Sequence, residues 1–362
     1  MESELSAFAS LMVRYAEAAH APIRSISGLR AVAHRLSAEF LVFLRLHRDD
    51  HDIWLSVQLV DAATGAVILA ERGRVRSYDV IPFSQCGVLA QRMECTLVEH
   101  AAKRSRRRER RTAVDYYLLG NGIDPDDRFL NQKARRAFEM PLSLDDSHPL
   151  AWAGLAETYC TDAFLEFSDN FDATLDTALR FIERATALNP KSSRAAWVTG
   201  RIFHLRHEWE LAEKALNHAT SLNPNDADAQ AMMGSFLIHV GRSEEAIPAL
   251  KRSFVLNPLA NTRVYWALGA AYYNLGQYQL AIDSLNEIIV RRPNFTRPCR
   301  LVAAAYAMMG RVGKAEQVRE TRLMSDATNI LASAGAYMGR TTRTQRDIDH
   351  LLTGFQKAGF PT

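Results

Sequence analysis

The sequence predicts a mainly α-helical chain, in which a superhelix of stacked helix hairpins follows a small α/β domain. The first observation is a repeat. Asn-Pro pairs stand at 189–190, 223–224 and 257–258, and Arg292-Pro293 takes the same place one unit later, at spacings of 34, 34 and 35 residues. The second observation is a change of period before residue 100, where short apolar runs alternate as strands do.

Each unit between these pairs carries the same internal marks. A small residue stands in its first half, an alanine follows twelve residues later, and a leucine follows four residues after that. In chain order these are Gly200, Ala212 and Leu216; Gly234, Ala246 and Leu250; and Gly269, Ala281 and Leu285. Small residues let two helices approach closely, large residues fill the space between them, and the closing proline ends the second helix. Each unit is therefore a hairpin that must stack on its neighbours to bury its apolar face.

The pattern resembles the tetratricopeptide repeat, because its small, apolar and proline positions recur in register. That resemblance implies about six hairpins over residues 113–330, stacked into a right-handed superhelix, with a capping segment at 331–362. The last helix is expected at 346–357. Such repeats host many functions, so the resemblance predicts a fold and leaves the function open.

The hairpins before residue 189 are less regular. Residues 113–119 and 131–138 are expected to pair as one hairpin, and 148–159 and 173–188 as the next. The extra residues between the latter two helices, from Cys160 to Asn170, are expected to form a long loop or an extended helix.

Residues 1–100 predict the α/β domain. Its expected elements are helices at 4–20 and 27–36, strands at 40–44, 53–59 and 66–70, and a helix from Phe83 past His100. Polar turns are expected between the strands.

Three short stretches resemble a bacterial signalling arrangement: Val32 to Ser37 (VAHRLS), Gln58 to Gly65 (QLVDAATG) and Lys357 to Pro361 (KAGFP). They are similar to the TolB-like α/β segment and tetratricopeptide repeats that form the C-terminal half of class III adenylate/guanylate cyclases and of related winged-helix regulators. The resemblance covers roughly residues 5–362, and it implies a regulatory role.

The chain departs from that family at several places. Phe43-Leu44 stands where the family has Glu-Gly, Leu69 stands where it has Trp, and the opening strand of its sheet is missing before Glu2. We therefore expect a sheet that is incomplete or is completed by another chain, with self-association through the α/β domain. No cyclase catalytic domain or winged helix fits before residue 27, so catalysis is not implied.

A dense basic run lies in the linker at residues 101–112, which is expected to be helical. It comprises Lys103, Arg104, Arg106, Arg107, Arg108, Arg110 and Arg111. Like charges repel and extend a segment, so a solvated linker is one interpretation. The other is attraction of phosphates, an acidic partner or an anionic membrane surface. No aromatic residue is interleaved to stack on bases, which disfavours nucleic acid as the partner.

Composition narrows the class of protein. A net charge of +3 over 362 residues does not indicate nucleic-acid binding. The cysteines, at positions 86, 95, 160 and 299, form no C-x-x-C pair, which disfavours a disulfide framework or a zinc site. The sequence shows no signal-peptide core and no apolar run long enough to span a membrane, so a cytoplasmic location is expected.

No motif predicts an enzyme, a cofactor or a metal site. His204 and His207 lie one helical turn apart, but no third ligand or His-Glu-x-x-His motif accompanies them, so a surface or groove role is expected. The stretch 310–314 has two residues between its glycines where a P-loop has four, so Gly310 is expected at an inter-helix turn. The nucleophile motif G-x-S-x-G is also missing.

The candidate functional surface is the concave face, which the first helix of each stacked hairpin lines. Arginine and aromatic side chains, which carry much of the binding energy at interfaces, are frequent there. The residues are Arg194, Trp197, Arg201, His204, His239, Arg263, Trp266, Tyr273, Asn274, Arg297 and Arg300, with Asp228 and Ser235 between them. For Trp197 and Trp266, packing against adjacent helices is an equal alternative. The Lys/Asn carboxylate clamp of chaperone-binding relatives is not reproduced.

We therefore expect a non-catalytic protein–protein interaction or regulatory module of a bacterial signalling system. Its partner is expected to be a peptide or protein, acidic in character, bound in the concave groove. The alternative is a transcription-associated regulator that contacts DNA through the basic linker or through a missing N-terminal domain.

Overall fold

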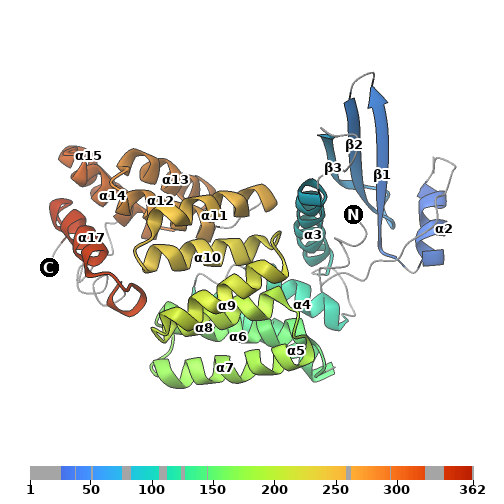
Figure 1. Ribbon diagram of the computed structural model, residues 1–362, viewed down its shortest axis with the longest axis horizontal. Helices are drawn as coiled ribbons and strands as arrows, with labels where there is room; N and C mark the ends of the chain where they lie inside the picture. The colour runs from blue at the N-terminus through green and yellow to red at the C-terminus, as the bar shows by residue number, and fades with distance from the viewer. Residues whose placement is uncertain are drawn as a thin grey trace. The chain divides into compact units, whose positions relative to one another are not determined.

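The computed structural model describes residues 26–36, 38–49, 52–75, 83–105, 112–123, 127–144, 146–257, 262–293, 295–322 and 338–360. The chain divides into two compact units. The first comprises residues 1–123 and 136–146, and the second comprises residues 124–135 and 147–362. Figure 1 shows the elements of both units.

The first unit contains a three-stranded antiparallel sheet in the order β1-β2-β3 (Figure 1). Its strands are β1 (Phe40–Asp49), β2 (Asp52–Asp61) and β3 (Val67–Val75). Side chains alternate between the two faces of a strand, so Leu55, Val57 and Leu59 of β2 share one face. They form a buried cluster with Leu89, Ala90 and Met93 of α3 (Phe83–Ser105).

The other face of the sheet is covered by α2 (Ile26–Leu36). Ala33 of this helix packs with Leu41 and Ala62 in a second, smaller buried cluster. A sheet with a helix on each face is the α/β arrangement that the sequence predicts for this part of the chain.

Asp61 joins the end of β2 to α3. Its side chain is 1% exposed, and its Oδ1 accepts hydrogen bonds from the backbone N–H groups of Ala63 and Thr64, both at 2.9 Å. Its Oδ2 lies 3.2 Å from His100 Nε2 and 3.3 Å from Arg104 Nη1. Burial raises the pKa of Asp61, but these hydrogen bonds and the charge of Arg104 outweigh burial and hold the pKa below its usual value. Asp61 therefore lies at the turn after β2, where the sequence predicts one, and also helps to hold α3 against the sheet.

The second unit is a superhelix of helix hairpins (Figure 1). Its pairs are α6 (Pro149–Phe164) with α7 (Phe171–Leu188), α8 (Ser193–Leu205) with α9 (Trp209–Leu222), α10 (Ala227–His239) with α11 (Ser243–Leu256), α12 (Thr262–Asn274) with α13 (Tyr278–Arg291), and α14 (Arg297–Met308) with α15 (Val312–Arg322). Before them come α4 (Ala113–Asn121) and α5 (Arg128–Leu144), and the boundary between the units falls within α5. The predicted fold class is confirmed.

The Asn-Pro pairs mark the ends of second helices, as predicted. Asn189, Asn223 and Asn257 are the C-terminal caps of α7, α9 and α11, and Arg292 is the cap of α13. Asp226 then caps the N-terminus of α10, because its side chain accepts hydrogen bonds from two backbone N–H groups of the first turn.

Close approach of the two helices in a hairpin depends on glycine. A Cβ atom added to these glycines would lie 2.7, 2.6 and 2.7 Å from a leucine Cγ of the partner helix: Gly200 faces Leu216, Gly234 faces Leu250, and Gly269 faces Leu285. Cβ atoms do not approach other heavy atoms so closely, so a larger residue forces the helices apart. The roles that the repeat pattern assigns to the small and large positions are confirmed.

The turn inside each hairpin needs a residue in the left-handed conformation. Gly241, Gly276 and Gly310 have φ angles of 82°, 71° and 73°. Gly310 therefore lies at an inter-helix turn, as predicted. His207 holds the same position in its hairpin with φ of 61°, a strained conformation for a residue with a side chain.

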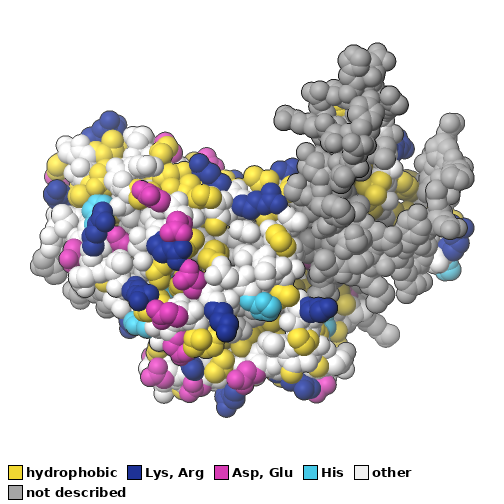
Figure 2. Space-filling view, in the orientation of Figure 1, with side chains coloured by type: hydrophobic (Ala, Val, Ile, Leu, Met, Phe, Trp, Pro, Cys, Tyr) yellow, Lys and Arg dark blue, Asp and Glu magenta, His cyan; other side chains and the backbone are white. Residues whose placement is uncertain are grey.

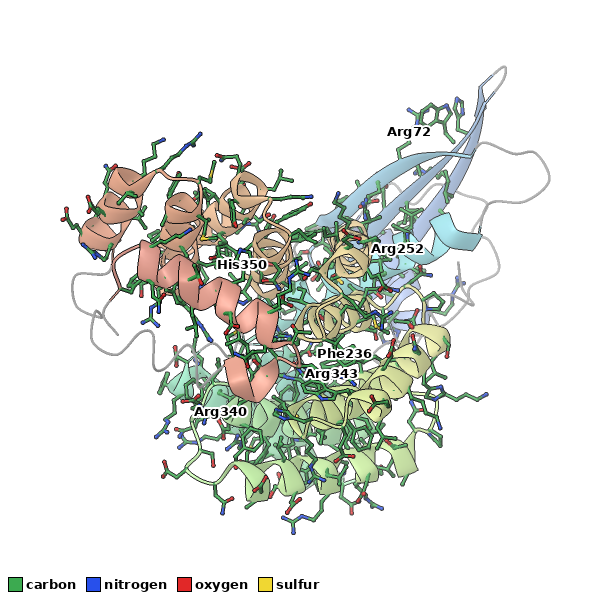
Figure 3. All side chains as sticks on the ribbon, turned by 60° about the vertical axis from the view of Figure 1, so that its left-hand side comes forward. Arg72, Phe236, Arg252, Arg340, Arg343 and His350 are labelled. Carbon is green, nitrogen blue, oxygen red and sulfur yellow. The ribbon has the colours of Figure 1, made fainter. Side chains whose placement is uncertain are left out.

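The chain returns to the repeats in residues 338–360, called here the C-terminal segment. A helical turn at 338–341 leads into α17 (Gln345–Lys357), which packs against α14 and α12. Phe355 and Phe360 are buried in the same core cluster, with ring centroids 5.4 Å apart. Figure 3 shows α17 lying across the repeat helices.

Some boundaries differ from the predicted ones. Strands β1 and β3 run on to Asp49 and Val75, because backbone pairing continues through polar residues that apolar periodicity does not mark. The extra residues after Cys160 form both expected structures, since α6 continues to Phe164 and a loop precedes α7.

Some predictions fall on residues that the structure does not describe. They are the helix expected at 4–20, the basic residues at 106–111, the repeat proline at 258 and the last residue of the closing motif, Pro361.

Gly234→Ala is expected to lower the free energy of unfolding by about 1–3 kcal/mol, the usual cost of overpacking. The reason is that the new Cβ atom meets Leu250 across the hairpin. Urea unfolding followed by circular dichroism measures the change.

Gly313→Ala is the matched control for that experiment. Gly313 lies in α15, and no heavy atom is within 4 Å of a Cβ added there. This substitution should be neutral, or should stabilise the chain by up to about 1 kcal/mol through helix propensity. Equal losses in the two variants would contradict the close-approach explanation.

Candidate functional site

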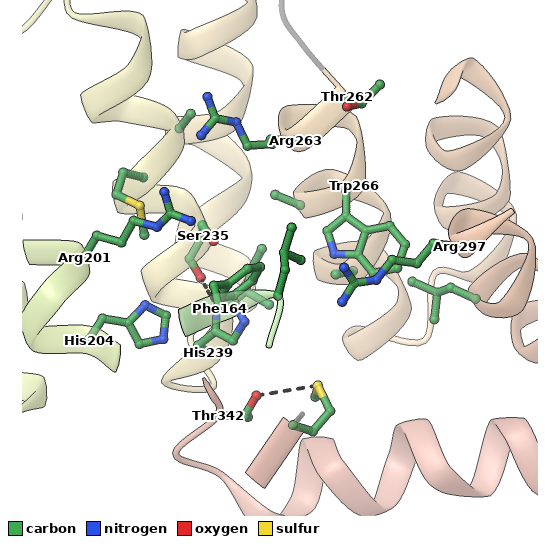
Figure 4. Close-up of a pocket in the computed structure, with 18 of the residues that line it drawn as sticks. Phe164, Arg201, His204, Ser235, His239, Thr262, Arg263, Trp266, Arg297 and Thr342 are labelled. Carbon is green, nitrogen blue, oxygen red and sulfur yellow. Dashed lines mark hydrogen bonds between the residues drawn. The ribbon is translucent and has the colours of Figure 1, made fainter. Parts of the chain in front are cut away.

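The second unit contains a partly open cavity of about 440 Å³ on the face formed by the first helices of its hairpins. Helices α8, α10, α12 and α14 line it, the end of α6 contributes to it, and the C-terminal segment closes one side. Figure 4 shows Arg201 and His204 of α8 across the hollow from Arg297 of α14, with Thr342 of the C-terminal segment at its edge. Segments far apart in the sequence therefore meet around one site.

Most of the predicted groove residues line this cavity. They are Trp197, Arg201, His204, His239, Arg263, Trp266, Tyr273, Asn274, Arg297 and Arg300, and Asp228 and Ser235 line it as well. Arg194 does not, because its Nη2 points to Glu157 Oε2 at 2.9 Å. The register of the repeats thus brings together nearly all of the side chains that the sequence places on this face.

Aromatic rings lie beside the guanidinium groups on both sides of the cavity. Arg297 Cζ lies 5.5 Å from the ring centroid of Trp266, and Arg201 Cζ lies 5.7 Å from that of Phe164. Trp197 is 4% exposed, and it both packs in the core and lines the cavity. Groove and packing, the two alternatives for the tryptophans, are therefore combined at both, since the half-buried Trp266 also packs against a core cluster and lines the cavity.

A carboxylate of α6 holds two arginines in place. Glu157 accepts hydrogen bonds from Arg194 Nη2 at 2.9 Å and from Arg263 Nη1 at 3.2 Å. Burial raises the pKa of Glu157, but the charges of Arg194, Arg263 and Arg201 outweigh burial and lower the pKa to about 2. Glu157 is therefore ionised at neutral pH, and it positions the Arg263 guanidinium at the edge of the cavity.

Three histidines lie where the C-terminal segment meets α8 and α10. His204 Nε2 donates a hydrogen bond to the carbonyl of Thr341, and His207 Nε2 donates one to the carbonyl of Arg340, both at 2.8 Å. His239 lies beside His204, with ring centroids 4.8 Å apart. A surface or groove role is predicted for His204 and His207, and both side chains contact this segment. The hydrogen bond of His207 offsets the strain of its left-handed backbone.

His204 and His239 are neutral near neutral pH. Burial, together with the nearby His239, Arg201 and His207, lowers the pKa of His204 to about 3, although the hydrogen bond to Thr341 acts in the opposite direction. Burial also lowers the pKa of His239, whose Nδ1 donates to the Ser235 carbonyl at 2.7 Å. His204 and His239 therefore add no charge to this end of the cavity, and the second ring nitrogen of each is a hydrogen-bond acceptor.

Helix α17 makes aromatic contacts at the other end of the cavity. The His350 ring stacks on Tyr273 with centroids 4.9 Å apart, and its Nε2 lies 2.9 Å from Tyr278 Oη. A Cβ atom added to Gly354 would lie 1.8 Å from Tyr273 Oη, so this helix approaches α12 as closely as glycine allows. Figure 3 shows His350 on α17, and Arg340 and Arg343 on the turn before it.

Some of the side chains that sequence reasoning missed lie on the repeat helices, such as Met232 of α10 and Leu301 of α14, and others come from outside the regular repeats. Met338, Thr342, Leu351 and Phe355 belong to the C-terminal segment, and Phe164 belongs to the added turn of α6. The repeat register indicates which face of a first helix points inward, but it carries no information on where a later segment returns. The four-residue spacing of Leu351 and Phe355 is the one signal of an apolar face there.

The basic run lies in the first unit. Arg104 is engaged by Asp61 and lies 3.6 Å from Glu39 Oε2, and Lys103 Nζ lies 2.5 Å from Glu99 Oε1. The other five arginines of the run lie outside the described residues.

No group of three His, Cys, Asp or Glu side chains in the described part of the chain is arranged to hold a metal ion. Cys160 is buried, and burial raises its pKa to about 12, which keeps the thiol protonated. Among the same residues, no helix has the length and apolar character needed to cross a membrane.

The free energy of unfolding is expected to fall by about 1 kcal/mol between about pH 7.5 and about pH 5.5 because of His204. Its pKa is lower in the folded chain than in the unfolded chain. The unfolded chain therefore binds the proton first, and acid favours unfolding. Urea unfolding at the two pH values measures this fall, and His204→Gln should make it smaller by about that amount.

His218→Gln is the control for this pH dependence, because His218 of α9 is exposed. This variant should lose as much stability at the lower pH as the unaltered chain does. A fall that is unchanged in His204→Gln would contradict the role assigned to His204.

Two comparisons of sequence agree with this fold. Residues 262–295 match the family described as Tetratricopeptide repeat. A TPR repeat-containing protein of Methanocaldococcus jannaschii is 26% identical to this chain over 184 residues, which are 51% of this chain and 29% of that protein. The peroxisomal targeting signal receptor of Candida glabrata is 28% identical over 106 residues, which are 29% of this chain and 18% of the receptor. The chain thus spans less than a third of the length of either relative.

Solved structures show a similar arrangement of helices. A human IFIT1 dimer with m7Gppp-AAAA has a TM-score of 0.52 and 16% sequence identity, and the match covers 77% of this chain and 66% of that one. The APC/C hetero-tetramer Cut9-Hcn1 has a TM-score of 0.50 and 18% identity, and the match covers 73% of this chain and 49% of that one. The helical part of the chain is therefore a tetratricopeptide-like superhelix, and residues 262–295 match the repeat in sequence as well.

Proposed function

We propose that this chain is a non-enzymatic interaction module that binds an acidic segment of a peptide or protein at the arginine-lined cavity. The observation that carries the proposal is the gathering of Arg201, Arg263, Arg297 and Arg300 around one hollow. A guanidinium group binds a carboxylate through two parallel hydrogen bonds, and arginine and tryptophan are the residues most often found to dominate binding energy at interfaces.

The balance of charge in the cavity favours an acidic partner. Four arginines line it against two acids, Glu166 and Asp228, and Glu166 is paired with Arg340 of the C-terminal segment. By contrast, basic and acidic side chains are interspersed over the helical unit on the face in Figure 2. Positive charge is therefore more concentrated in the cavity than on that face.

The fold supports a protein or peptide as the partner. Stacked helix hairpins present extended faces that many proteins use to bind other chains. One relative in sequence is a targeting signal receptor, which is consistent with such a role.

We also propose that the module serves a bacterial signalling system in the cytoplasm, where it regulates another component. The support is the resemblance of VAHRLS and QLVDAATG to the regulatory half of class III cyclases.

Self-association through the first unit is part of this proposal. It is supported by β1, an edge strand of the described sheet, on which Val42 and Leu44 are 38% and 48% exposed.

Selection from a displayed library of random peptides tests the interaction. The unaltered chain should enrich peptides rich in Asp and Glu. The double variant Arg297→Gln, Arg300→Gln should bind the enriched peptides at least about tenfold more weakly, a loss of about 1.4 kcal/mol. These two arginines are preferred to Arg263, because replacing Arg263 also disturbs Glu157.

Arg311→Gln is the matched control, because Arg311 is exposed outside the cavity, between α14 and α15. It should leave the affinity unchanged. Enrichment without acidic residues, or equal affinity in all three proteins, would refute binding at the cavity.

A further inference from the structure

The described part of the cavity differs from an open peptide groove in having a roof. Met338, Thr342, Leu351 and Phe355 of the C-terminal segment contribute to its lining. This roof is attached through His204 to the Thr341 carbonyl and through Tyr273 to the His350 ring. A ligand held inside the cavity leaves these contacts intact.

The size of the cavity matches a small molecule. Its volume of about 440 Å³ lies within the usual range of small-molecule sites, which is about 300–1,000 Å³. Such sites combine apolar walls with a few convergent polar groups. Here Trp197, Trp266 and Phe164 supply the apolar walls, and arginines supply the polar groups.

The side chains of the cavity walls favour a ligand that is both anionic and flat. Arg201 lies beside Phe164, and Arg297 lies beside Trp266, with the hollow between the two pairs (Figure 4). A flat ring can stack on the aromatic faces while an anionic group on that ring meets a guanidinium group. A cation is disfavoured there, because it would meet the same arginines.

The neutral histidines contribute no charge to the cavity. His204 and His239 line it, and each donates its one N–H to a backbone carbonyl. The second nitrogen of each ring is an acceptor, so neither histidine offers an anion a donor. The arginines therefore decide the sign of the ligand.

We propose that the roofed cavity is a binding site for a small aromatic anion, a planar ring that carries one carboxylate or phosphate group. This site goes beyond the proposed peptide function, because its ligand is a small molecule held inside the cavity. The two ligands use the same arginines, so they compete. A bound aromatic anion also holds the C-terminal segment against α8, α12 and α14, since it contacts all of them, and it stabilises the closed form by mass action.

Fluorescence titration with anilinonaphthalene sulfonate, an aromatic anion, tests the site. Saturable binding of one probe per chain is expected. Arg297→Gln with Arg300→Gln should weaken it at least about tenfold, whereas Arg311→Gln should leave it unchanged. The uncharged analogue N-phenyl naphthylamine is the control for ring stacking, and its weaker binding should be the same in all three proteins.

Competition and thermal unfolding identify the anion. Naphthylacetate or naphthyl phosphate should displace the probe and raise the unfolding temperature of the unaltered chain, and the more effective one identifies carboxylate or phosphate as the preferred group. Neither should raise the unfolding temperature of the double variant.

Several results would overturn this inference. They are probe binding that the double variant retains, equal affinity for the charged and uncharged probes, or no saturable binding. If acidic peptides are enriched and bound while the probe is not, the proposed function stands and the small-molecule site is refuted. If the probe binds as described while no peptide is enriched, the small-molecule site stands and the proposed peptide binding is refuted.

Discussion

The contact between a glycine of the first helix and a leucine of the second is the constraint on which the helical unit depends. At Gly200, Gly234 and Gly269 there is no room for even a methyl group. The two helices of a hairpin therefore pack at minimum distance, and their remaining apolar surface has to be buried against the next hairpin. Repetition of this contact turns the first helix of every hairpin toward one face. The arginines and tryptophans of that face are brought together as a consequence.

Two titratable groups near this face are kept in opposite states: Glu157 stays charged because it is paired, and His204 stays neutral because it is buried. Glu157 remains ionised because Arg194 and Arg263 contact it, and it fixes Arg263 at the cavity. His204 is instead neutral because it is buried beside other basic groups. The result is a site whose positive charge comes from arginine alone, which makes its sign independent of pH across the physiological range.

The C-terminal segment partly covers this face. Its attachments use residues that occupy unusual positions in the repeats. His207 stands where the turns of the next three hairpins have glycine, and its side chain reaches the Arg340 carbonyl. Tyr273 fills the space against Gly354 of α17. These departures from the repeat pattern are explained by contacts with a segment outside it, which agrees with the expectation that breaks in a local rule mark sites of special packing or function.

The sequence by itself determined the repeat, its helix boundaries near the Asn-Pro pairs, and the inward face of the first helices, because all three follow from a period that local packing enforces. Most of the groove residues that it indicated line the cavity, since helical register is a local property. Only the tertiary structure decided that Arg194 turns away to Glu157, that Asp61 is buried beside Arg104, and that residues 338–360 roof the cavity. These depend on contacts between residues distant in sequence, for which neither spacing nor composition carries a signal.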